Sequence, residues 1–267
     1  MNLALAGLSY GVTIFALILL AVQSRKLIAI FKTGQPDPTR SNNKPQRLRM
    51  MLGEVFGHTK MLNFTVVGFA HWFVMVSFFG LFGTLVTAYG QLINPYFIIP
   101  VIGHFWVYEY ITELLAWTTG IAIVALIGIR QVTLRTNKRS RFAGSGNWKA
   151  YYVEATVLAV VFCVIALRGL EGALSDETAW NRHFITTWFI ADMFKSMSLS
   201  QITLWIQIVA TIKIVTSMLW FVVLAANLTM GITWHRFLAP FNIFYRRNAD
   251  GTSSLGALPP MLSHGEE

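Results

Sequence analysis

Five long apolar segments constrain the fold of this chain more than any other feature. A helix needs about 20 mostly apolar residues to cross the hydrocarbon core of a bilayer, with a range of about 17–25. Segments of that kind cover residues 3–23, 62–88, 104–129, 151–167 and 202–234. Only 12% of all residues are charged, whereas about 25% are charged in a soluble domain. The sequence therefore predicts an all-α membrane protein, a bundle of five transmembrane helices.

The segments differ in length, and the chain changes character after Pro240. The fourth segment is the shortest, and the fifth is long enough that it should tilt or protrude into the cytoplasm. Between them, residues 183–195 are rich in aromatic side chains and predict a short interfacial helix on the outer side. The C-terminal stretch is small, polar and rich in Gly and Pro, which is typical of a linker. We therefore predict a membrane domain over 1–240 and a cytoplasmic linker or tail over 241–267.

Basic residues gather in alternate loops. The first loop, the third loop and the tail carry them, whereas residues 89–103 have no charge and the loop around Glu171 is slightly acidic. Positive loops stay on the cytoplasmic side of a membrane. We therefore predict an N-terminus outside, a C-terminus inside, and a multi-pass protein of the cell inner (plasma) membrane. Because the net charge of +9 lies in these loops, it predicts no nucleic-acid partner.

Cysteine and nucleotide motifs limit the chemistry. Cys163 is the only cysteine, so an intrachain disulfide is excluded. An iron–sulfur cluster needs about four thiolates, and any such cluster must therefore lie on a partner or on a further extension. The sequence contains no recognisable nicotinamide, flavin or nucleotide motif.

Two histidines within or beside apolar segments indicate a cofactor site. His71 lies in the second segment and His235 closes the fifth. An imidazole in hydrocarbon is costly and usually marks function. Two imidazoles from different helices can hold a haem iron from both faces, which predicts a b-type haem and electron transfer. Histidines that only hydrogen-bond across helices remain the alternative.

The other histidines are weaker candidates. His58 precedes the second segment, and at about 100° per residue it would not share a helix face with His71. We expect a solvated loop histidine there. His104 and His183 fall on the outer side, where they would flank a quinone pocket or simply lie at the interface. All three stay open as alternative ligands, also for a second haem.

Two sequence motifs carry a family resemblance. GFAHWFVMVSFFGLFGT resembles the second helix of the gamma-subunit-like cytochrome b domain of respiratory nitrate reductases and membrane heterodisulfide-reductase-like proteins. WHRFLAPFNIFY resembles the end of the fifth helix in the same group. The resemblance covers residues 12–245. Within the group, the chain resembles the membrane part of actinobacterial iron–sulfur reductases that connect electron-transferring flavoprotein to menaquinone.

The resemblance implies a haem count and its protein contacts. By position, His71 and His235 match the axial ligands of the haem nearer the cytoplasm. Family members with two haems carry two further histidines, and the corresponding residues here are Leu81 and Ser217. One haem b is therefore expected. Arg236 is the expected partner of its propionates, with Arg47 and Arg49 of the first loop as further candidates.

Charged residues within the outer halves of the segments indicate a second site. Glu109 and Glu113 lie on one face of the third segment, Lys213 lies in the fifth, and Arg168 ends the fourth. We expect Glu113 and Lys213 to pair, since pairing lowers the desolvation cost of each. With His104, this cluster would line a menaquinone pocket and relay protons, Glu113 and Lys213 being its catalytic residues. A purely structural ion pair is the alternative.

These observations favour a redox subunit. It would pass electrons between a cytoplasmic iron–sulfur or flavoprotein donor and menaquinone, as part of an oxidoreductase that is not self-sufficient in this chain. A quinol-oxidising gamma-type subunit of a nitrate reductase- or hydrogenase-like complex is the alternative within that class. A cofactor-free membrane anchor is the alternative of another class. A transporter is disfavoured because the segments show neither a repeat nor helix-breaking interruptions.

Overall fold

A computed structural model describes residues 2–137, 147–176 and 179–252. Five stretches are long and apolar enough to cross a membrane, as the sequence predicts: Leu3–Phe31, Lys44–Gly80, Trp106–Thr133, Asn147–Leu174 and Leu199–Ala226. No strand occurs within these described ranges. The helices are α1 (Leu3–Phe31), η1 (Pro38–Arg40), α2 (Lys44–Phe56), η2 (Met61–Phe64), α3 (Thr65–Gly80), α4 (Phe82–Ile93), α5 (Trp106–Asn137), α6 (Asn147–Leu174), α7 (Trp188–Phe194), α8 (Leu199–Ala226) and α9 (Gly231–Phe244).

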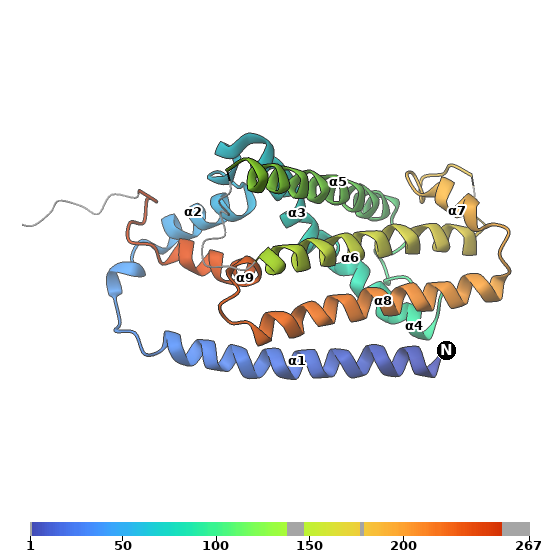
Figure 1. Cartoon of the computed structure of the whole chain (residues 1–267), viewed down its shortest axis with the longest axis horizontal. Helices are drawn as coiled ribbons and strands as arrows, with labels where there is room; N and C mark the ends of the chain where they lie inside the picture. Colours follow the sequence, from blue (N-terminus) through green and yellow to red (C-terminus); the bar gives the residue numbers. More distant parts are fainter. Residues whose placement is uncertain (1, 138–146, 177–178, 253–267) are drawn as a thin grey trace, which may run out of the picture.

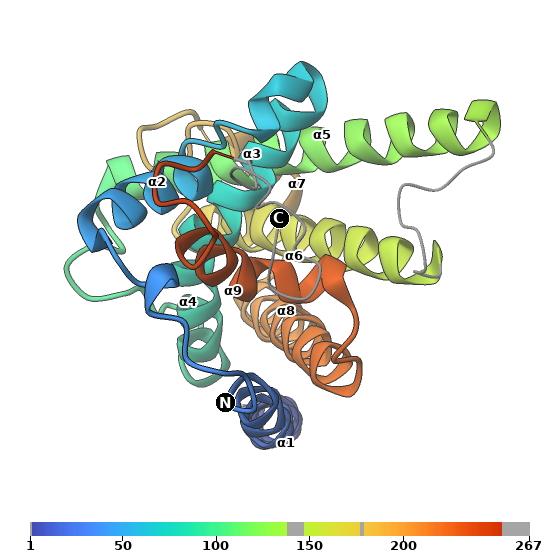
Figure 2. The same cartoon turned by 90° about the vertical axis from the view of Figure 1, so that its left-hand side faces the viewer.

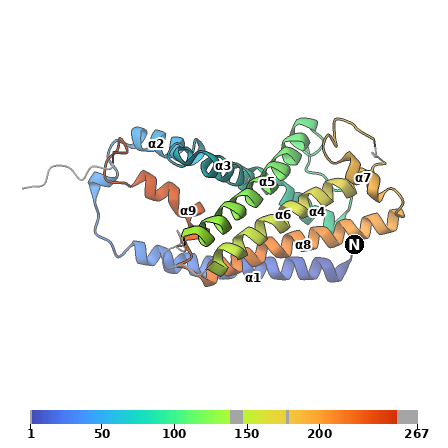
Figure 3. The ribbon, with the colours of Figure 1, turned by 45° about the horizontal axis from the view of Figure 1, so that its top comes forward.

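The long helices run side by side along the molecule (Figure 1). Helix α1 packs mainly against α8, α8 against α6 and α4, and α5 against α3 and α6. The short helices α2 and α9 pack together at one end, and α7 lies at the other, as Figures 1 and 3 show. We call these the α9 end and the α7 end. The N-terminus lies at the α7 end.

Small residues let α1 approach the bundle. Its buried side chains are Ala6, Ser9 and Ala16, and the hydroxyl groups of Thr13 and Tyr89 are 2.5 Å apart. Small residues of this kind allow close backbone contact where lipid provides no hydrophobic driving force between helices. Large apolar side chains point outward instead, as Ile18 and Phe162 do. Such a surface suits hydrocarbon and would be unfavourable in water.

The second segment crosses the bundle as two helices. Helix α3 ends at Gly80 and α4 begins at Phe82, with a slight change of direction between them (Figure 3). A Cβ atom at Gly83 would collide with the Tyr108 hydroxyl, so glycine permits the close approach of α5 there. Near the start of α4, the carbonyl and the hydroxyl of Thr84 accept hydrogen bonds from Lys213, at 2.8 and 2.6 Å.

Three expected boundaries differ from the structure. The fourth segment is not short, because α6 runs to Leu174 and includes Arg168. The interfacial helix is shorter than residues 183–195 and covers only α7. The fifth segment is not one long helix over 202–234. It ends at Ala226, where the Asn227 amide donates to the Val223 carbonyl at 2.8 Å, and α9 starts separately at Gly231.

Arg47 ties α2 to the end of α9, where Figure 2 shows the two helices facing the viewer. Its side chain is fully buried. The guanidinium donates to the carbonyl oxygens of Thr39 at 2.9 Å, Asn42 at 2.7 Å, Phe244 at 3.0 Å and Arg246 at 2.6 Å. These carbonyls use its donors, so the expected role of Arg47 as a propionate partner is wrong. Arg49, the other first-loop candidate, is exposed on α2.

Replacing Arg47 with methionine should lower the free energy of unfolding by about 1.5–3 kcal/mol, because several buried carbonyls lose a charged donor. Limited proteolysis of the purified protein should then cut first between α1 and α2. Arg49→Met is the matched control, since that side chain is exposed and should change stability by less than about 0.5 kcal/mol. Equal protease resistance of the two variants would contradict the role of Arg47.

Candidate functional site

Three histidines gather at the α9 end. His58 Nε2 lies 2.9 Å from His71 Nδ1, and the ring centroids of His71 and His235 are 6.1 Å apart. The expectation of a solvated His58 is wrong, because this residue is only 6% exposed. We call His58, His71 and His235 the histidine cluster.

The local fold explains why His58 reaches His71. The chain leaves α2 at Gly57, and His58 adopts a left-handed conformation with φ of 49°. The following turn, η2, packs directly on α3, where a Cβ atom at Gly68 would collide with the Met61 backbone. The two histidines therefore do not belong to one continuous helix, and the 100°-per-residue argument does not apply to them.

The hydrogen bonds determine which nitrogen of each ring carries the proton. His58 Nδ1 lies 2.9 Å from the Val55 carbonyl oxygen, which can only accept, so neutral His58 donates there and accepts at Nε2. His71 then donates from Nδ1 to His58 and keeps a lone pair on Nε2. His235 Nδ1 lies 3.3 Å from the Gly231 carbonyl, which leaves its Nε2 with a lone pair as well. Metal-binding histidines are oriented by second hydrogen bonds of this kind.

The environment keeps His235 neutral. Although its ring is open to solvent, desolvation by the surrounding protein lowers the pKa of His235, and the charge of Arg236 lowers it further. A neutral imidazole is the form that binds metals. The expected position of His235 at the end of a spanning helix is wrong, since it lies on α9, but its proximity to His71 is confirmed.

An apolar cavity of about 410 Å³ adjoins the histidine cluster. Volumes of about 300–1,000 Å³ are usual for bound cofactors and ligands. Val74 and Phe78 line it on the helix that carries His71, and Arg236 and Phe237 line it next to His235. Leu81 and Ser217 also line this cavity. These are the two positions at which relatives with two haems would carry further histidines.

Arg236 has no anionic partner within the described ranges. Its guanidinium lies 5.1 Å from the ring centroids of both Phe78 and Trp220, and desolvation lowers its pKa to about 10. Such a desolvated cation is stabilised by a carboxylate when one is present. Arg236 therefore marks the edge of the cavity at which the acidic group of a bound cofactor would lie.

A second cluster lies at the α7 end, around Arg168. Its guanidinium contacts Glu113 at 3.2 Å, Glu171 at 2.8 Å and Glu109 at 3.7 Å, and it donates to the His183 carbonyl. We call these four side chains the Arg168 cluster. The spacing of Arg168 and Glu171 by three residues is the sequence signal that could have identified its centre.

The expected ion pair between Glu113 and Lys213 does not form. Glu113 accepts hydrogen bonds from Arg168, from the backbone and hydroxyl groups of Thr186 at 2.7 and 2.6 Å, and from the Thr187 hydroxyl at 2.7 Å. Lys213 donates to Thr84 instead. Glu113 and Lys213 therefore have different partners.

A polar cavity of about 50 Å³ lies between these groups. Glu109, Arg168, Glu171 and Lys213 line it, and Glu113 does not. The space is sufficient for water, which needs roughly 10–15 Å³ per molecule on this measure. The Tyr108 hydroxyl lines it without a hydrogen-bond partner, a residue that the sequence argument missed. Lys213 borders both the polar and the apolar cavity.

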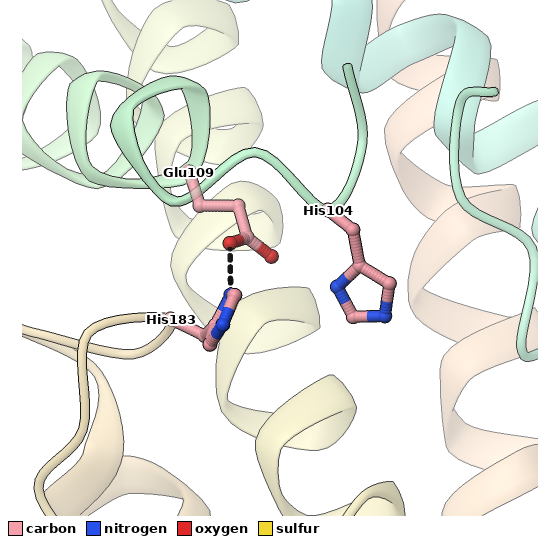
Figure 4. Close-up of side chains that lie close together, drawn as sticks. All are labelled: His104, Glu109 and His183. Atoms are coloured by element: carbon pink, nitrogen blue, oxygen red, sulfur yellow. Dashed lines mark hydrogen bonds and ion pairs between the residues drawn. The ribbon is translucent and has the colours of Figure 1, made fainter. Parts of the chain in front are cut away.

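His104 and His183 lie beside this cluster and far along the bundle from the histidine cluster. Figure 4 shows His104 in the segment before α5, Glu109 on α5, and His183 in the segment before α7. His183 Nδ1 is 2.7 Å from a Glu109 carboxylate oxygen. The two remaining histidine candidates therefore belong to a separate site.

Comparisons with known proteins give no match: no protein-family model, no curated protein and no solved structure matches this chain. The assignment of function therefore depends on the residues and their geometry.

Proposed function

We propose that this chain is the haem b-binding membrane part of a quinone-linked oxidoreductase. It would carry electrons between a cytoplasmic iron–sulfur or flavoprotein donor and menaquinone. The haem would supply reversible one-electron chemistry at an iron without an open coordination position.

One observation carries this proposal: the ring centroids of His71 and His235 are 6.1 Å apart, and the hydrogen bonds at both Nδ1 atoms leave a lone pair on each Nε2. With metal–nitrogen bonds of about 2 Å, two imidazoles on one iron would have ring centroids roughly 6 Å apart. The observed 6.1 Å fits that arrangement. The adjoining cavity is mainly apolar, and Arg236 at its edge suits a propionate. His71 and His235 would hold the iron, His58 would orient His71, and Arg236 would bind the propionate.

The distribution of basic residues indicates which end of the bundle would receive the electron donor. The described basic residues of the first loop, of the C-terminal part of α5 and of the segment after α9 lie toward the α9 end, which the positive-inside rule assigns to the cytoplasm. The donor would therefore dock at the α9 end, next to the histidine cluster. We infer the plasma membrane as location on the same grounds.

The quinone head group would lie beside the polar cavity and not beside Glu113. Lys213 borders both cavities, and Glu109 and Glu171 line the polar one, so a quinone head group near Lys213 would have titratable groups and water beside it. Glu113 is saturated with hydrogen bonds and serves to position Arg168. This revises the catalytic pair expected from the sequence to Lys213 with Glu109 and Glu171.

The test is a reduced-minus-oxidised visible spectrum of the detergent-purified protein, with haem quantified per chain. We expect a b-type spectrum and about one haem per chain, because His71 and His235 together would hold one iron. A redox titration of that signal would separate quinone reduction from the quinol-oxidising gamma-type alternative. A wild-type protein that stays colourless after haem-supplemented expression would support the cofactor-free anchor.

A further inference from the structure

His104, Glu109 and His183 form a compact set of metal-ligand atoms at the α7 end. One ligand atom from each residue lies within 4.8 Å of the other two. The residues come from three different segments, and Figure 4 shows them around one point, with Glu109 and His183 joined by a hydrogen bond. Glu109 is 5% exposed, whereas His104 is open to the surroundings.

The charges next to this set are not balanced. Glu109, Glu113 and Glu171 all contact the single guanidinium of Arg168. Lys213 makes its contacts with Thr84 and forms no direct ion pair with them. Lys213 lines the same cavity, so the three carboxylates exceed the two nearby cations by one negative charge in a largely buried place. A bound cation would offset this charge.

The donor atoms select the kind of cation. Two imidazoles and one carboxylate are ligands of zinc-class transition metals, whereas Mg²⁺ and Ca²⁺ prefer oxygen ligands alone. Three protein ligands with a fourth position for water is a common zinc arrangement. We infer that His104, Glu109 and His183 bind a divalent transition-metal ion of the zinc class.

The required adjustment is small. Ligand atoms around a tetrahedral zinc ion lie roughly 3.3 Å apart, given bonds of 2.0–2.1 Å. The Glu109–His183 pair, at 2.7 Å, would open slightly, and rotation of the exposed His104 ring would bring its nitrogen closer. Arg168 faces the same carboxylate at 3.7 Å, but its charge is already offset by Glu113 and Glu171.

The ion would have two consequences for the fold. It would join the segment before α5 to the segment before α7, and the latter is otherwise held to α6 by Arg168 and to α5 by Thr186. It would also lie at the wall of the polar cavity, because Glu109 and Gly103 line that cavity. A bound ion would take the Glu109 oxygen that faces His183 and leave the other oxygen to Arg168. The site does not depend on the histidine cluster or on haem.

The test is zinc binding by the full chain, purified with a tag that contains no histidine. Equilibrium dialysis with ZnCl₂ and metal analysis should give one saturable Zn²⁺ per chain, and zinc should raise the thermal unfolding temperature. His104→Ala and His183→Ala should each weaken binding at least about tenfold. A hundredfold excess of Mg²⁺ should not displace the zinc.

Control variants separate this site from the other histidines. His264→Ala removes a histidine outside the described residues, and His71→Ala removes one from the histidine cluster. Both should retain the zinc site. Because His104 is exposed, His104→Ala should fold normally, and zinc-edge X-ray absorption of the wild type should show two imidazole ligands. No saturable binding, or unchanged affinity in His104→Ala, would refute the site whether or not the protein binds haem.

Discussion

Arg168→Met should leave little folded protein in the membrane. The variant keeps the volume of the side chain but removes the guanidinium that contacts Glu109, Glu113 and Glu171. Breaking a buried ion pair from one side costs about 3–5 kcal/mol, a large part of a typical total stability of about 5–15 kcal/mol. Thermal unfolding in detergent, followed by the fraction that stays monodisperse, should show a strongly destabilised or aggregated protein.

Two variants serve as references for that loss. Arg182→Met removes an exposed arginine from the segment before α7 and should change stability by less than about 0.5 kcal/mol. Combining Arg168→Met with Glu113→Gln should recover part of the lost stability, because one unpaired carboxylate disappears with the guanidinium. An Arg168→Met protein that unfolds at the wild-type temperature would show that water or protons, and not Arg168, balance the carboxylates.

His71→Ala should abolish haem binding, whereas His58→Ala should only weaken it. The ring centroids of His71 and His235 are 6.1 Å apart, and His58 contacts Nδ1 of His71 and leaves its Nε2 to the iron. Loss of an axial ligand removes one iron bond, and loss of a ligand's orienting partner costs roughly 10–100-fold in metal affinity. The b-type difference spectrum per chain, measured across haem concentrations during reconstitution, distinguishes the two results.

His104→Ala is the matched control for these variants, since it removes a histidine at the α7 end and should leave the haem spectrum unchanged. His235→Ala should behave like His71→Ala. If His235→Ala retained full haem while His58→Ala lost it, the iron would be held by His58 and not by α9. If all three variants retained full haem, the histidine cluster would be structural.

Hydropathy alone predicted the five spanning segments, since crossing a bilayer requires little more than apolar length. It failed where charged residues find partners inside the bundle. The end of α6 was missed because Arg168 and Glu171 stop an apolar run, although the fold neutralises both charges. The break between α8 and α9 was missed because residues 227–230 remain fairly apolar while their backbone turns.

The sequence indicated which residues carry polar chemistry but not all of their partners. His71 and His235 lie close together, and Arg236 lines the adjoining cavity. Depth in the membrane can be counted from sequence, but the direction in which each helix face points depends on packing. That is why Lys213 meets Thr84 instead of Glu113, and why His58 meets His71 only through a turn whose path the sequence does not specify.

The packing of α1 bears on how the protein is made. Helix α1 precedes the other described helices in the chain, yet its principal partner is α8, which follows α3 to α6. Chains emerge and fold from the N-terminus, so α1 must wait in the bilayer without its main partner while α3 to α6 are inserted. The contact between the small residues of α1 and α8 can therefore form only after α8 has been translated.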